Sequence, residues 1–61
     1  MNYIVSDKWG NEYVSNYSEN GALITENPEE AIRIETLTEA ARIAEMLTES
    51  TGVRWDAIEV I

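Results

Sequence analysis

Residues 36–52, TLTEAARIAEMLTESTG, are the stretch of the chain that decides its fold. Thr36 and Glu39 have the spacing of a capping box, in which the hydroxyl and the carboxylate each satisfy a free backbone N–H at the start of a helix. Gly52 suits the left-handed residue that follows a helix end. The stretch therefore predicts a helix that begins after Thr36 and runs to about Ser50.

This predicted helix is amphipathic. Its apolar residues recur at three- and four-residue spacing, which places them on one face and predicts packing against a sheet. Three of them are alanines, which allow a helix to approach a sheet closely. The predicted apolar face consists of Leu37, Ala40, Ala41, Ala44 and Leu47, with Ile43 at its border. The opposite, polar face consists of Thr38, Arg42, Glu45 and Glu49.

Before the helix, the chain reads as short strands separated by turns. Residues 3–5 and 12–17 are rich in the aromatic and β-branched side chains that favour strands. Between them, Gly and Asn at 10–11 tolerate the positive φ of a hairpin turn. Asn and Gly at 20–21 form a second hairpin signal, after which residues 22–25 form a third short strand or an extended connection.

Three more segments complete the predicted fold. A proline begins one helical turn over residues 28–31, because proline suits the first position of a helix. Residues 32–35 alternate in polarity, which predicts a strand with Ile32 and Ile34 facing inward. The last strand covers residues 55–61.

Together these elements predict one α+β domain over residues 1–61. It has a small, mainly antiparallel sheet in the order β-β-(β)-β-α-β, with one amphipathic helix packed on one face. A chain of 61 residues has room for one domain with one modest core.

Charge is the dominant feature of the composition. Twelve acidic residues against four basic ones give a formal net charge of −8. Because such a surface repels phosphates, we expect neither direct nucleic-acid binding nor binding to anionic membranes. A basic protein surface would attract it. Alternatively, the charge serves only to keep the domain soluble.

Catalytic and metal-binding residues are scarce. The chain has no cysteine and no histidine, which removes disulfides, thiolate sites and the commonest metal ligand. No serine stands in a recognisable nucleophile motif. The ENPEE segment at residues 26–30 lacks the alternating ligands of a calcium loop, and its acids instead favour the start of a helical turn. We expect no catalysis, no cofactor and no metal site.

The chain also shows no targeting signal. Segment 1–7 lacks a basic stretch followed by a long apolar run, so it does not resemble a signal peptide. No apolar run approaches the ~20 residues of a membrane helix. We therefore expect a cytoplasmic protein.

Several segments together resemble a known class of protein. They are YIV at residues 3–5, GNEYV at 10–14, NPEEAIRIET at 27–36 and EAARIAEML at 39–47. The chain resembles the short, mostly uncharacterised accessory proteins of phages and prophages, in which a hairpin precedes an Ala-x-Arg-apolar-x-Thr strand and a Glu- and Ala-rich helix. Here residues 31–36 match that strand. The resemblance implies an accessory function in the cytoplasm of an infected bacterium, exerted by binding a host or phage protein.

Aromatic side chains are the first candidates for partner binding. If Ile4 and Val14 point toward the helix, Val5 and the tyrosines line the opposite face, and an uncovered aromatic patch there is typical of a protein interface or a homodimer. Alternatively, paired tyrosines only stiffen the hairpin. Trp9 at the turn tip is either a partner anchor or a lid over the sheet edge, whereas Trp55 is predicted in the core. The predicted partner-binding residues are Tyr3, Trp9, Tyr13 and Tyr17.

Acidic side chains are the second candidates. Carboxylates spaced along an exposed surface could imitate a phosphate backbone. The alternative function is therefore a nucleic-acid-mimicking inhibitor of a DNA-processing or defence enzyme. An acidic helix face that is merely solvated is the simpler interpretation. The acidic candidates are Glu35, Glu39, Glu45, Glu49, Asp56 and Glu59.

These observations predict a small, acidic, non-catalytic module that binds a protein. They do not identify the partner.

Overall fold

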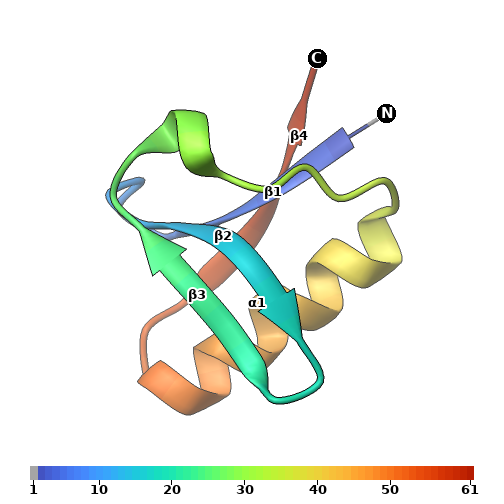
Figure 1. The fold of residues 1–61 in the computed structure, drawn as a ribbon. Helices are drawn as coiled ribbons and strands as arrows, with labels where there is room; N and C mark the ends of the chain where they lie inside the picture. The colour runs from blue at the N-terminus through green and yellow to red at the C-terminus, as the bar shows by residue number, and fades with distance from the viewer. Residues whose placement is uncertain (1) are drawn as a thin grey trace.

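The computed structural model describes residues 2–61, so the first residue of segment 1–7 lies outside it. Three strands are followed by a 3-10 turn, a helix and a last strand (Figure 1). The elements are β1 (Asn2–Asp7), β2 (Tyr13–Ser18), β3 (Gly21–Thr25), η1 (Pro28–Glu30), α1 (Leu37–Thr51) and β4 (Trp55–Val60). The predicted α+β fold is confirmed, and the uncertain third segment is a strand.

The sheet has four antiparallel strands in the order β3-β2-β1-β4. β4 pairs with β1 over its whole length, from Trp55 opposite Asp7 to Val60 opposite Asn2. This pairing makes β1 a central strand and leaves β3 and β4 as the two edges. It also brings the start of β1 and the end of β4 side by side (Figure 1).

The connection from β1 to β2 is organised by a buried carboxylate. Asp7 Oδ1 accepts hydrogen bonds from the backbone N–H of Asn11 at 2.9 Å and of Glu12 at 3.2 Å. β1 and β2 then share one residue pair, Ser6 opposite Tyr13, before they diverge. β1 and β2 are therefore joined by a single residue pair at this junction.

The gap between the diverging strands is filled by the chain just before α1. Ile34 exchanges two backbone hydrogen bonds of 2.8 Å with Tyr3, and the Ile32 N–H donates to the Val14 carbonyl at 2.9 Å. The predicted strand over residues 32–35 is therefore wrong, since only an isolated bridge forms. One edge of β1 is divided between β2 and this segment, so neither has room for a long ladder.

Helix α1 begins and ends as predicted. Thr36 is the N-cap, and its hydroxyl accepts from the Glu39 N–H at 3.3 Å. Gly52 ends the helix with a left-handed φ of 75°. Only half of the capping box forms, because the Glu39 carboxylate pairs with Arg42 instead of returning to the N-cap amide.

The buried stripe of α1 differs from the predicted one. Ile43, predicted at the border, is completely buried, so it lies at the centre of the stripe. Leu37 is 53% exposed and Ala41 is also exposed. Ala41 lies beside the outer edge of β4, where no further strand lies beneath it, and Leu37 precedes it by about one turn on the same side of the helix.

The core lies between α1 and one face of the sheet, as the helix position in Figure 1 shows. Trp55 is only 5% exposed, which confirms its predicted place in the core. Among residues 2–61, no helix combines the length and apolar character needed to cross a membrane. The buried core consists of Val5, Val14, Ile34, Ala40, Ile43, Ala44, Leu47 and Trp55.

Candidate partner-binding surface

The two faces of the sheet carry different side chains. Along a strand, side chains alternate between faces, and directly paired residues share a face. Val5 and the opposite Ala57 face α1, where both contribute to the core. Ile4 and the opposite Ile58 therefore lie on the other side, which we call the open face. The prediction that Ile4 points toward the helix and Val5 away from it is wrong.

The register of the first hairpin explains this reversal. Because Ser6 lies opposite Tyr13, the alternation places Val5 on the same face as Val14. The prediction placed Ile4 there, which would require a register shifted by one residue. Such a shift moves every side chain of a strand to the other face.

The predicted tyrosine patch does not form. Tyr13 lies on the open face, whereas Tyr3 and Tyr17 are partly buried and pack against the core on the α1 side. A β-bulge between Val14 and Asn16 shifts the alternation of β2 by one residue. The bulge turns Tyr17 to the face of Val14, away from Tyr13.

Trp9 lies apart from the core, in the loop after β1. It is 61% exposed, and the Lys8 ammonium lies 4.8 Å from the centre of its ring, within range of a cation–π interaction. The nearby Tyr13 hydroxyl donates to the Gly10 carbonyl at 2.9 Å. Tyr13 therefore contacts the loop that carries Trp9, whereas Tyr3 and Tyr17 lie on the α1 side of the sheet.

The acidic candidates are interrupted by basic side chains. Arg42 pairs with Glu39, and Arg54 Nε lies 3.1 Å from Asp56 Oδ1. The remaining acidic candidates have no ion pair within residues 2–61. They are Glu35, Glu45, Glu49 and Glu59.

The outer edge of β4 presents free backbone groups. In an antiparallel pair, the N–H and C=O of successive residues point alternately toward and away from the partner strand. Tyr3 directs both groups to Ile34, so the opposite residue, Glu59, directs its own groups outward. By the same alternation, Ala57 and Trp55 also point their N–H and C=O groups outward.

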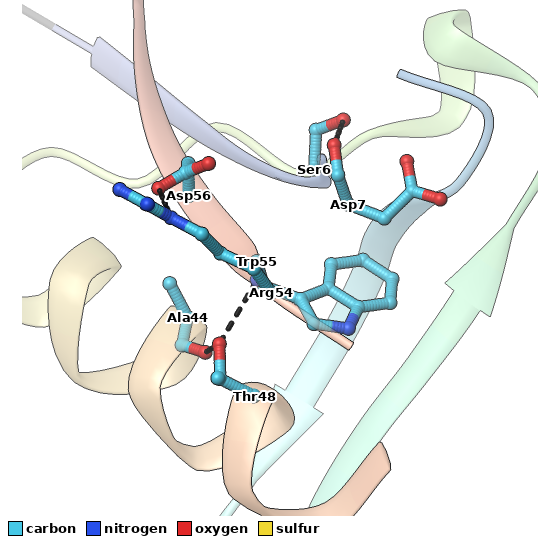
Figure 2. Close-up of polar contacts among 7 residues, drawn as sticks. All are labelled: Ser6, Asp7, Ala44, Thr48, Arg54, Trp55 and Asp56. Atoms are coloured by element: carbon cyan, nitrogen blue, oxygen red, sulfur yellow. Dashed lines mark hydrogen bonds and ion pairs between the residues drawn. The ribbon is translucent and has the colours of Figure 1, made fainter. Parts of the chain in front are cut away.

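The Trp55 N–H agrees with this assignment, because it donates to Thr48 Oγ1 on α1 at 2.9 Å (Figure 2). The Thr48 hydroxyl in turn donates to the Ala44 carbonyl at 2.8 Å, so the helix and β4 are fixed to each other. No hydrogen bond within residues 2–61 engages the outward groups of Ala57 or Glu59.

A groove of about 390 Å³ runs between α1 and this free edge. Small side chains on its helix side leave room, and one charged group, Glu45, lines it there. In Figure 2, the paired Arg54 and Asp56 lie on the strand side of the groove, above Ala44 and Thr48. The groove is lined by Ala41, Ala44, Glu45, Thr48, Arg54, Trp55, Asp56 and Ala57.

Sequence reasoning named Asp56 and Glu59 of β4 as acidic candidates but missed Ile58 and the free strand edge. Ile58 is 43% exposed on the open face, next to the free edge. With Trp55 assigned to the core, simple alternation already places Ile58 on the opposite side. The signal was present, but only the tyrosines and Trp9 were considered as surface anchors.

Within residues 2–61, no three His, Cys, Asp or Glu side chains lie close enough to hold a metal ion together. The chain matches no family model, no curated protein and no solved structure.

Proposed function

We propose that this chain is a small, acidic, non-catalytic module that binds another protein through β4. The observation that carries the proposal is that β4 is an edge strand whose outward groups at Ala57 and Glu59 are unpaired among residues 2–61. Unpaired strand edges are ready sites for pairing with another chain.

Apolar exposure next to this edge supports the proposal. Ile58 is exposed beside the edge on the open face, and Ile61 is exposed just after β4 ends. An exposed apolar patch at a strand edge, rimmed by acids such as Asp56 and Glu59, has the make-up of a protein interface. In keeping with its resemblance to phage accessory proteins, the module would act on a host or phage protein.

A pull-down with two matched variants tests this function. We expect the tagged domain to capture a defined protein from bacterial lysate, and Ile58→Ser to lose it. Leu23→Ser, the same kind of change at an exposed apolar residue on the other sheet edge, should retain it. Mass spectrometry identifies the captured protein. Equal capture by both variants would contradict binding through β4.

Nucleic-acid mimicry remains the second candidate. Glu45 and Glu49 on α1 have no ion pair within residues 2–61, which favours it. Mimicry requires that the captured protein be a nucleic-acid enzyme and that capture weaken steeply from low to moderate salt. Capture that survives moderate salt would count against mimicry.

A further inference from the structure

We propose that the partner adds an extended strand to β4, and that this strand inserts a lysine or arginine side chain into the groove beside Glu45. The inference rests on the proposed protein-binding function and specifies its mode and the chemistry of the partner.

Backbone groups define where the added strand pairs. The N–H and C=O of Ala57 and of Glu59 point outward and are unpaired among residues 2–61. At the other end of the edge, the Trp55 N–H is occupied by Thr48. An added strand therefore finds its hydrogen-bonding positions at Ala57 and Glu59.

The apolar side of α1 extends past β4, so it could also cover a fifth strand. Ala41 lines the groove at the free edge of β4 and is exposed, and Leu37, about one turn earlier on the same side of α1, is 53% exposed. A strand placed beside β4 would lie under these two apolar side chains and would bury them. Burial of apolar surface would then stabilise the added strand.

The groove selects the side chain that enters it. A residue opposite Ala57 shares its face and so points toward the helix side, into the groove that Ala41 and Ala44 line. Those small side chains suit an aliphatic stem, while Glu45 suits a cationic end group. Arg54 does not oppose the cation strongly, because its own charge is balanced by Asp56.

Charge distinguishes this occupant from a second copy of the chain. Two copies could pair β4 with β4 around a twofold axis centred on Ile58, but Glu59 of one copy would then lie opposite Ala57 of the other, beside Glu45. Each copy also carries a net charge of −8. A basic segment of another protein meets complementary charge at the same position.

The test uses two blocked peptides, TVTKTVT and TVTETVT, titrated into the full chain and followed by amide NMR. We expect TVTKTVT to shift the Ala57 and Glu59 amides and to bind about five-fold more tightly than TVTETVT, as one partly exposed ion pair allows. Glu45→Gln should remove this preference, whereas Glu49→Gln, further along α1 and outside the groove, should keep it.

Ala57→Pro is an independent way to prevent strand addition at the edge of β4. The Ala57 N–H does not pair with β1, so proline removes only the outward donor, which an edge strand tolerates. We expect peptide binding to be lost. Because this variant could lose the fold, the Glu45→Gln result carries the test if its amide spectrum is not that of a folded domain.

Three results would overturn the inference: no shift at Ala57 and Glu59 with millimolar peptide, a peptide preference unchanged by Glu45→Gln, or concentration-dependent shifts at these amides without peptide. The last would indicate self-pairing. These failures are distinguishable from failure of the proposed function. If capture of a protein from lysate still depends on Ile58, the chain binds its partner on the open face without strand addition.

Discussion

The half of the molecule built from β1, β4 and α1 is joined more tightly than the hairpin of β2 and β3. β1 and β4 pair at every residue from Asn2 to Asp7, and α1 packs on both. The hairpin meets β1 at one residue pair, Ser6 with Tyr13, and through the core side chains Val14 and Tyr17. The contrast suggests that the first half sets stability and that the second half depends on it.

The largest expected loss of stability comes from a change in the half built from β1, β4 and α1. Ile43 is completely buried in the core under α1, so Ile43→Ala should lower the free energy of unfolding by about 3 kcal/mol through the cavity it leaves. The expected total for a domain of this size is only about 3–9 kcal/mol. Urea denaturation followed by circular dichroism measures the loss. Leu37→Ala, on the same helix but exposed, should cost less than about 1 kcal/mol; equal losses would refute the assigned helix face.

The next effect is on the junction between the halves. Asp7→Ala removes the acceptor of the Asn11 and Glu12 amides and should cost about 2 kcal/mol. Hydrogen exchange should accelerate more in β2 and β3 than in β1 and β4. Asp56→Ala, which breaks an exposed ion pair, serves as control and should change little. Uniform acceleration across the sheet would show that the halves do not separate.

A smaller effect is expected where α1 meets β4. Thr48→Val removes the hydroxyl that accepts from the Trp55 N–H, at a cost of about 1 kcal/mol. The Trp55 amide should show the clearest increase in exchange. Thr38→Val, on an exposed part of α1, is the matched control. An unchanged Trp55 amide would mean that this bond contributes nothing to joining helix and strand.

The smallest effect is expected at the end of the hairpin. Leu23 is 65% exposed on β3, so Leu23→Ser should change stability by less than about 0.5 kcal/mol in the same urea experiment. A loss of several times that size would show that the hairpin contributes more than its packing indicates, and would weaken the contrast between the halves.

Local signals in the sequence predicted the elements well. Thr36 and Gly52 marked the two ends of α1, and the proline-led turn and both hairpins formed where expected. Each of these features depends on a few neighbouring residues. Trp55 was also placed correctly, since a large aromatic side chain in a small domain is usually needed in the core.

Register was harder to predict. Whether Ile4 or Val5 faces the helix depends on the exact length of the loop closed by Asp7, and the side of Tyr17 depends on the bulge before Asn16. Neither follows from local propensity, because a bulge or a one-residue shift reflects packing across strands. The register decides which side chains share a face of the sheet. The predicted tyrosine patch was therefore wrong, and the free edge at Ala57 went unnoticed.

The contrast between the two tryptophans gives the molecule a pair of built-in optical probes. Trp55 is 5% exposed, and its indole N–H donates to Thr51 Oγ1 at 3.2 Å, whereas Trp9 is 61% exposed on the first loop. A soluble quencher such as acrylamide should therefore reach Trp9 in the native state and Trp55 only after unfolding. With Trp9 replaced by Phe, the remaining fluorescence should report on the packing of β4 against α1 alone.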